Sequence, residues 1–173
     1  EVKVTFTNLN DGAYRLQTEF LVTASPKIVW EVLTDYERLP RFISTMQESK
    51  VTARYKNKLI VEQSANIPLF FWVKINRKVI LHIEELPFHE IRFIDTAHDQ
   101  IEQYQGSWKI SPEDDSTRVT YQINVKIPYL PFDFFSEKSL IEFSQNNISE
   151  VMHEIILRSG QPLSPTPRKW FWV

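Results

Sequence analysis

The 173-residue sequence contains no cysteine and only three glycines, and its formal net charge is −2. The lack of cysteine excludes disulfides, thiolate nucleophiles and cysteine-based zinc or iron–sulfur sites, and it leaves the redox compartment open. Three glycines are too few for a glycine-rich phosphate loop, and a nearly neutral chain disfavours nucleic-acid binding through bulk positive charge. No apolar run approaches the ~20 residues of a membrane-spanning helix. What remains is a compact chain long enough to bury roughly 70% of its unfolded surface, with room for a cavity.

A helix start stands out near the N-terminus, within the segment Leu21–Val51. Ser25 is a good N-cap, because its hydroxyl can accept from the free N–H groups of the first turn. Pro26 at the first helical position loses no hydrogen bond there. The apolar stripe that follows predicts an amphipathic helix, and it consists of Ile28, Val29, Val32 and Leu33.

Two-residue alternation of apolar and polar side chains predicts about seven strands. They are Tyr14–Val22, Gln47–Arg54, Lys58–Ala65, Trp72–Glu84, Glu90–Asp95, Gln100–Ile110 and Arg118–Ile127. Most of the connections are too short for crossover helices, so the sheet is predicted to be largely antiparallel.

The last predicted element is a long helix from Ser136 to about Arg158. Apolar residues recur there at three- and four-residue spacings, and Gly160 is a suitable stop before Pro162. A helix of this length spans on the order of 33 Å, enough to cross a whole sheet.

Residues 24–42 read A-S-P-x-x-V-W-x-V-L-T-D-Y-E-R-L-P-x-F, and Gly106–Trp108 and Thr117–Tyr121 follow in order. This pattern resembles the polyketide cyclase/dehydrase and coenzyme Q-binding group of START-like (SRPBCC) domains. The resemblance implies an α+β helix-grip fold, in which a curved antiparallel sheet wraps around the C-terminal helix, with two short helices after the first strand. It also implies a hydrophobic cavity between sheet and helix. We expect residues 1–160 to form one START-like ligand-binding domain and residues 161–173 a Pro- and aromatic-rich tail.

Three classes of function are open, because this superfold carries many functions. The first is non-catalytic binding or transport of a hydrophobic small molecule, such as a lipid, an isoprenoid quinone or a polyketide-like compound. The second is a cyclase/dehydratase-type enzyme, and the third is a ribosome- or protein-interaction module like the toxin branch. The sequence favours the first class, because it offers no convincing catalytic set. The four histidines have no metal-pair spacing, and we expect no cofactor and no metal.

Ligand contacts are predicted on the apolar faces of the strands and of the last helix. The predicted residues are Arg77, Tyr104, Trp108, Tyr121, Ile75, Val79, Phe143 and Met152. Arg77 has two interpretations, because a lone guanidinium on an apolar face is costly unless it is paired or solvated. Either the strand bends or bulges so that Arg77 meets Glu62, Glu102 or solvent, or Arg77 anchors the polar group of an apolar ligand.

Two apolar connections, 67–72 and 127–135, are predicted to form the cavity mouth through Phe70, Phe71, Phe132 and Phe134. They would cover the pocket as a lid or, if exposed, contact a membrane surface or a partner. The tail has the composition of an interfacial anchor, a docking peptide or a segment packed on its own sheet. We expect no nucleic-acid partner, and the sequence indicates no oligomeric state. The start at Glu1 and the T-D-Y-E-R-L-P signature favour an exported or periplasmic protein, after leader removal, over a cytoplasmic one.

Overall fold

The structure, a computed structural model, describes residues 2–70, 73–99, 101–126 and 137–160. Its elements, in chain order, are β1 (Lys3–Asn8), η1 (Asn10–Gly12), β2 (Tyr14–Val22), α1 (Pro26–Leu33), η2 (Tyr36–Arg41), β3 (Met46–Tyr55), β4 (Lys58–Phe70), β5 (Val73–Leu86), β6 (Glu90–Asp95), β7 (Gln103–Glu113), β8 (Ser116–Lys126) and α2 (Glu137–Arg158). The labels η1 and η2 denote short 3-10 helices.

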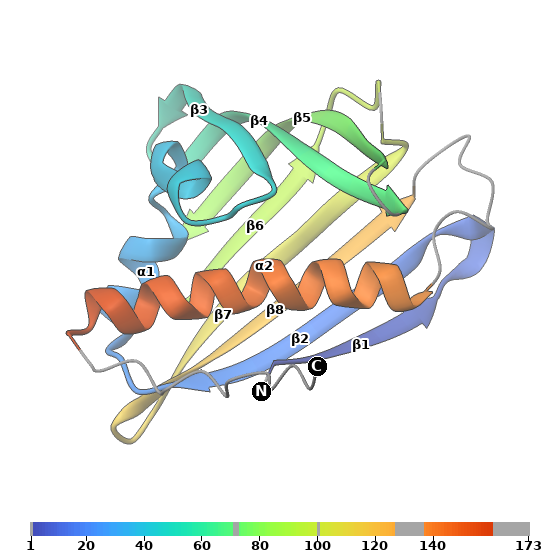
Figure 1. Cartoon of the computed structure of the whole chain (residues 1–173). Coiled ribbons are helices and arrows are strands. Elements are labelled where there is room, and N and C mark those ends of the chain that lie inside the picture. The colour runs from blue at the N-terminus through green and yellow to red at the C-terminus, as the bar shows by residue number, and fades with distance from the viewer. Residues whose placement is uncertain (1, 71–72, 100, 127–136, 161–173) are drawn as a thin grey trace, which may run out of the picture.

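Within this described part the strands form one eight-stranded sheet in the order β1-β2-β8-β7-β6-β5-β4-β3. Every neighbouring pair is antiparallel. Figure 1 shows the sheet curving around α2, which lies across its concave face, while α1 lies beside the C-terminal end of α2. The predicted helix-grip architecture is therefore confirmed.

The first strand, β1, is an addition to the predicted set of about seven. It pairs along its whole length with β2, from Lys3 opposite Glu19 to Asn8 opposite Tyr14. Sequence alternation did not reveal it, because the strand is short and its apolar residues are few. The two short helices consequently follow the second strand of the sheet and not the first.

Several strands extend beyond their predicted bounds. Strand β4 continues through Phe70, and β5 begins at Val73, so most of the segment 67–72 is strand and not a connection. The register places Pro68 opposite Lys74, which shows that β4 pairs with β5 across the predicted loop. Strand β7 is displaced towards the C-terminus because Pro112 still pairs with Thr117 of β8.

Helix α1 begins as its sequence predicts. The Ser25 side chain accepts a hydrogen bond from the Ile28 N–H at 3.4 Å, and Pro26 occupies the first turn. Val29 and Val32 are fully buried, so the apolar stripe of the helix faces the core. The short helix η2 follows α1 and carries the residues Tyr36 to Pro40 of the T-D-Y-E-R-L-P signature.

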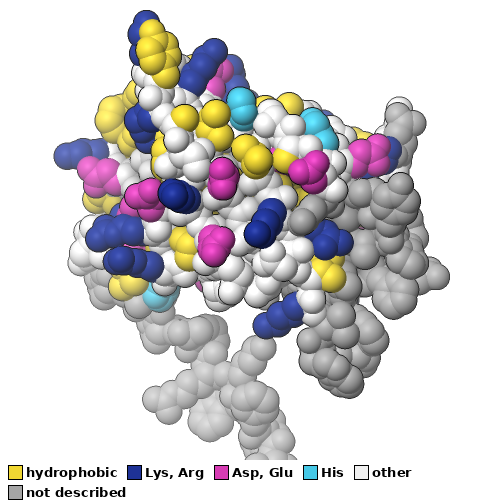
Figure 2. Space-filling model, turned by 90° about the horizontal axis from the view of Figure 1, so that it is seen from above, with side chains coloured by type: hydrophobic (Ala, Val, Ile, Leu, Met, Phe, Trp, Pro, Cys, Tyr) yellow, Lys and Arg dark blue, Asp and Glu magenta, His cyan; other side chains and the backbone are white. Residues whose placement is uncertain are grey.

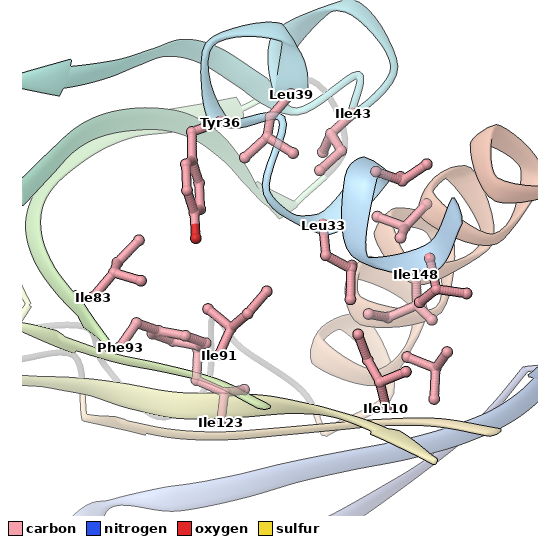
Figure 3. Packing of buried hydrophobic residues seen from close by; sticks show 14 of the residues in the cluster. Leu33, Tyr36, Leu39, Ile43, Ile83, Ile91, Phe93, Ile110, Ile123 and Ile148 are labelled. Carbon is pink, nitrogen blue, oxygen red and sulfur yellow. The ribbon is translucent and has the colours of Figure 1, made fainter. Parts of the chain in front are cut away.

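The core lies between the sheet and the helices. Figure 3 shows Ile83, Ile91, Phe93 and Ile123 of the sheet directed towards a second group from α1, η2 and α2. That group includes Leu33, Leu39, Ile43 and Ile148. Along α2 the buried residues are Leu140, Ser144, Ile148, Val151 and Ile155. Their spacing of three and four residues gives the helix one buried face. Gly160, with φ +72°, follows the last turn and confirms the predicted stop.

Three neighbouring strands come close together at Gly106 of β7. Gly106 lies opposite Phe93 of β6 and Ile123 of β8. A Cβ at this position would lie 2.1 Å from the Gln122 backbone oxygen and 2.8 Å from the Phe93 ring. The glycine of the Gly106–Trp108 motif is therefore required by steric fit.

We predict that Gly106→Ala lowers the free energy of unfolding by about 3 kcal/mol, because the backbone oxygen of Gln122 cannot move aside without disturbing the β7–β8 pairing. Urea denaturation measures the loss. Gly12→Ala is the matched control, since Gly12 has φ +74° but no atom within 4 Å of an added Cβ. We expect the control to cost about 1–2 kcal/mol through backbone strain alone. A loss at Gly106 no greater than at Gly12 would contradict the steric explanation.

Candidate functional site

An internal cavity of about 220 Å³ lies between the inner face of the sheet and α2. Its walls come from β2 and β3–β8, from α1 and η2, and from the half of α2 that runs from Leu140 to Val151. Most of the lining side chains are aliphatic or aromatic. The volume lies just below the range of roughly 300–1,000 Å³ that is typical of ligand pockets. A small apolar molecule, or one part of a longer one, fits this space.

The structure brings six of the eight predicted ligand contacts to the cavity wall. They are Arg77, Val79, Tyr104, Trp108, Tyr121 and Phe143. Ile75 and Met152 are half-buried but do not belong to the described lining. Met152 packs against the edge of the hydrophobic core instead. Contact of any of these residues with a ligand stays a prediction.

The predicted cavity mouth cannot be compared with the structure. Phe71, Phe132 and Phe134 lie outside the described residues, as does the tail 161–173. For Phe70 the structure describes the backbone alone, as the last residue of β4. The mouth and its membrane contact therefore stay predictions.

Arg77 lies on an unbroken stretch of β5, opposite Ala65 of β4. The pairing of β4 with β5 keeps its register from Lys58 to Pro68, so β5 has no bulge at Arg77. One guanidinium nitrogen, Nη1, donates to the Asn76 carbonyl at 3.1 Å, whereas Nε is buried without a hydrogen-bond partner. Among the described residues Arg77 forms no ion pair with Glu62 or Glu102, and Glu102 pairs with Lys126 at 2.7 Å. A buried donor therefore remains free at the cavity wall.

An aromatic group covers the part of the wall formed by β6, β7 and β8. The ring centroids of Trp108 and Tyr121 are 4.3 Å apart, and Phe93 contacts both Tyr104 and Tyr121 at 5.8 and 6.3 Å. Burial raises the pKa of Tyr104 and raises that of Tyr121 well above its ordinary value. A hydrogen bond between the two phenols raises the pKa of Tyr121 further and lowers that of Tyr104. Both phenols are therefore neutral near pH 7.

A buried carboxylate stands close to this aromatic group. Asp95 is 1% exposed, and its Oδ1 accepts from the backbone N–H groups of Ile80 and Ala97 at 2.9 and 3.2 Å. Its Oδ2 is buried without a partner. The charge of Asp95 contributes to the raised pKa of Tyr104, although Asp95 is not part of the described cavity lining. Sequence patterns gave no sign of this residue, because an acid at a strand end is common.

Tyr36, from the T-D-Y-E-R-L-P signature, lines the cavity and is 5% exposed. Its hydroxyl donates to Glu85 Oε1 at 2.9 Å, and Arg54 Nη1 donates to Glu85 Oε2 at 3.2 Å. Burial, followed by the charge of Glu85 and this hydrogen bond, raises the pKa of Tyr36. Tyr36 was not among the predicted site residues, and its partner Glu85 lies 49 positions away, so no local pattern predicts the pair.

Polar side chains of α2 form hydrogen bonds and an ion pair with the segment 35–45, which forms one wall of the cavity. Asn147 accepts from the Thr45 hydroxyl at 2.9 Å, and Glu150 accepts from the Ser44 N–H at 2.9 Å. About two turns further on, Arg158 forms an ion pair with Asp35 at 2.8 Å. The wall is therefore attached to the helix by polar contacts as well as by apolar packing.

Metal or membrane-spanning features are missing from the part of the chain that the structure describes. No group of three or more His, Asp or Glu side chains is placed there to hold a metal ion. None of the helices in those residues is long and apolar enough to cross a membrane. The site is thus an apolar cavity with a few polar groups at its wall.

The family described as "Polyketide cyclase / dehydrase and lipid transport" matches residues 22–154. Among curated proteins no sequence is significantly similar. Solved structures, in contrast, include many with the same fold.

The STAR-related lipid transfer protein from Xanthomonas axonopodis has a TM-score of 0.70 at 15% identity, over 88% of this chain and 98% of that chain. Human STARD10 has a TM-score of 0.69 at 17% identity, over 88% and 73% of the two chains. Zhui aromatase/cyclase from Streptomyces sp. R1128 has a TM-score of 0.67 at 12% identity, over 86% and 94%. At these identities the likeness shows the fold alone, which is the START-like helix grip.

We predict that the free energy of unfolding falls as the pH rises above 10. The ordinary pKa of tyrosine is 10.0, and the folded protein raises the pKa of Tyr36, Tyr104 and Tyr121 above it. Below pH 10 these phenols are protonated in both states, whereas above it the unfolded chain ionises first and is favoured. Each buried tyrosine contributes a slope of about 1.4 kcal/mol per pH unit.

Urea denaturation between pH 9 and about 11 measures this slope. The double variant Tyr104→Phe/Tyr121→Phe is expected to flatten it. The control Tyr55→Phe removes a hydroxyl from a side chain that is 72% exposed, and it should leave the slope as it is. Equal slopes in all three proteins would show that the two cavity phenols ionise normally.

Proposed function

The chain belongs to the polyketide cyclase/dehydrase and lipid transport family, and from this premise we propose that it binds or carries a hydrophobic small molecule without converting it. The family and its fold fit the binding of a hydrophobic ligand. The ligand class would be a lipid, an isoprenoid quinone or a polyketide-like compound, held by the domain of residues 1–160. The observation that carries this proposal is an apolar cavity with one free buried donor, Arg77 Nε.

The apolar wall supplies the affinity in this proposal. Val79, Leu81 and Ile83 follow one another on the inner face of β5, and Ile148 and Val151 face them from α2. Each Å² of apolar ligand surface removed from water contributes roughly 25 cal/mol. A ligand with little apolar surface would gain too little to offset the cost of its own ordering.

In this proposal, Arg77 orients the ligand within the cavity. Its unpaired Nε is a donor in a buried position, and a buried donor without a partner costs free energy. A ligand carbonyl, carboxylate or phosphate oxygen at the cavity wall would satisfy it. A charged acceptor would gain most, because hydrogen bonds between ions are roughly twice as strong as neutral ones. We therefore propose that the ligand carries an oxygen acceptor beside Arg77.

An enzyme of cyclase/dehydratase type is the second candidate, favoured by the phenol pair at the cavity wall and by the fold shared with an aromatase/cyclase. General acid–base chemistry needs a base as well as an acid. The raised pKa values keep Tyr104 and Tyr121 protonated, so they serve as donors and not as bases at neutral pH. The buried Asp95, whose charge acts on Tyr104, is outside the described lining. A binder is therefore the better supported proposal.

The third candidate, a ribosome- or protein-interaction module, would need a surface of one dominant charge. Figure 2 shows Lys and Arg side chains beside Asp and Glu on the described part of one face, with apolar side chains between them. Ion pairs such as Arg92 with Glu90, at 2.6 Å, reduce the effective charge further. This mixed surface favours the small-molecule proposal.

We predict that native mass spectrometry of the gently purified protein shows a stoichiometric ligand, released by organic solvent as an apolar compound with an oxygen acceptor. The protein is mixed in parallel with lauric acid and with an apolar quinone to load any empty fraction. A protein that arrives empty and takes up neither probe would contradict the proposed function. A bound compound that changes chemically during incubation would favour the enzyme.

We predict that Arg77→Leu weakens the binding of lauric acid about tenfold or more, and that of dodecane less than about twofold, because only the acid uses the guanidinium. Displacement of a fluorescent apolar probe measures both affinities. Arg92→Leu is the matched control, since Arg92 lies on the outer face of β6 with 55% of its side chain exposed. Equal losses for acid and hydrocarbon would indicate that Arg77 shapes the cavity without contacting the head group.

A further inference from the structure

Tyr36 places a polar atom deep among apolar side chains, at a part of the cavity distant from Arg77 along β5. Figure 3 shows its hydroxyl oxygen directed towards Ile83, Ile91 and Phe93. Tyr36 is 5% exposed, and all four side chains line the cavity. The oxygen is therefore within the apolar space and not at its rim.

The Tyr36 hydroxyl already donates a hydrogen bond within the protein. Its acceptor is Glu85 Oε1 at 2.9 Å, and Glu85 is 8% exposed. Tyr36 is thus the donor of this pair and a carboxylate oxygen of Glu85 is the acceptor. Arg54 holds the other carboxylate oxygen at 3.2 Å, which keeps Glu85 in place. The raised pKa of Tyr36 agrees with a phenol that retains its proton.

The Tyr36 hydroxyl can still accept a hydrogen bond from a ligand. A hydroxyl has two lone pairs besides its proton, and among the hydrogen bonds of the described residues none is donated to Tyr36 Oη. The neighbouring cavity side chains Ile83, Ile91 and Phe93 bring no polar atom. Glu85 and Arg54 are not part of the described lining, so the Tyr36 hydroxyl oxygen is the acceptor that this part of the cavity wall presents to a ligand.

Arg77 presents the opposite chemistry, because a guanidinium has donors and no acceptor. Arg77 and Glu85 both lie on the inner face of β5 with eight residue steps between them, so the Arg77 donor and the Tyr36 hydroxyl beside Glu85 are separated along the strand. The inner face between them carries Val79, Leu81 and Ile83. The cavity is thus apolar along its length, with a donor near one end and an acceptor towards the other.

We propose that Tyr36 is a second polar subsite of the cavity, which selects ligands that bear a hydroxyl or an N–H at the end remote from their carbonyl or carboxylate. The ligand class is then an elongated apolar molecule with an oxygen acceptor at one end and a hydrogen-bond donor at the other, such as a hydroxylated fatty acid. This inference rests on the proposed function, because it assumes that the cavity holds a hydrophobic ligand.

The test compares lauric acid with ω-hydroxylauric acid, which differ by one terminal hydroxyl. Isothermal titration calorimetry gives the dissociation constants for the parent protein and for Tyr36→Phe. We expect the variant to bind ω-hydroxylauric acid about tenfold more weakly, because the hydroxyl is then buried without an acceptor, and lauric acid within about twofold of the parent. Tyr55→Phe, which removes a phenol oxygen at an exposed hairpin tip, is the matched control and should change neither value.

Tyr36→Phe leaves Glu85 with Arg54 as its remaining side-chain partner, so the variant can be unstable. The double variant Tyr36→Phe/Glu85→Leu removes the carboxylate together with the hydroxyl, and such paired replacements are often nearly neutral. It should show the same selective loss for ω-hydroxylauric acid. Agreement between the two variants would separate the hydroxyl contact from any general weakening of the fold.

Each other outcome overturns a distinct statement. If both acids lose affinity equally, or neither does, Tyr36 is a structural residue and this inference is wrong. If the parent protein binds both acids without any hydroxyl preference that depends on Tyr36, the subsite fails while the proposed function stands. If the parent protein binds neither acid nor any other apolar probe, the proposed function itself fails.

Discussion

The packing of α2 onto the concave face of the sheet is the interaction on which the rest of the structure depends. One face of the helix, from Leu140 to Ile155, meets apolar side chains from most of the strands. A single sheet cannot bury its inner face alone, so the helix supplies the second layer of the domain. The part of α2 from Leu140 to Val151 lines the cavity, whereas Ile155 does not, so the same packing leaves the cavity between the layers.

Periodicity in the sequence was sufficient to predict most strands, the long C-terminal helix and the face on which Arg77, Tyr104 and Tyr121 lie, whereas the arrangement in two layers was predicted from the family resemblance. Alternation and helical spacing are local signals, and the strands and helices that they define are formed by neighbours in sequence. The short strand β1 and the true ends of β4 and β5 escaped prediction, since pairing with adjacent strands extends them. The bonds of Tyr36 to Glu85 and of Ser44 to Glu150 join residues 49 and 106 positions apart, and no local pattern determines such partners.

The polar groups of the cavity differ in what they can do chemically. Arg77 donates, Tyr36 can only accept from a ligand, and the phenols of Tyr104 and Tyr121 are held neutral by their burial. None of these groups is a base at neutral pH. A wall of this kind suits the proposed recognition of the oxygens and hydroxyls of a ligand better than acid–base chemistry on it. The unsatisfied donor also makes the empty state less stable than a filled one.

The order of strands has a consequence for how the protein is made. Strand β2, near the N-terminus, pairs on one side with β8, from Tyr14 opposite Val125 to Val22 opposite Thr117. The chain up to Val125 must therefore be synthesised before β2 is fully paired with this neighbour, and α2 follows later still. Contacts so distant in sequence slow folding, and until they form the apolar inner face is exposed. A newly made chain thus exposes to solvent the same apolar face that later lines the cavity.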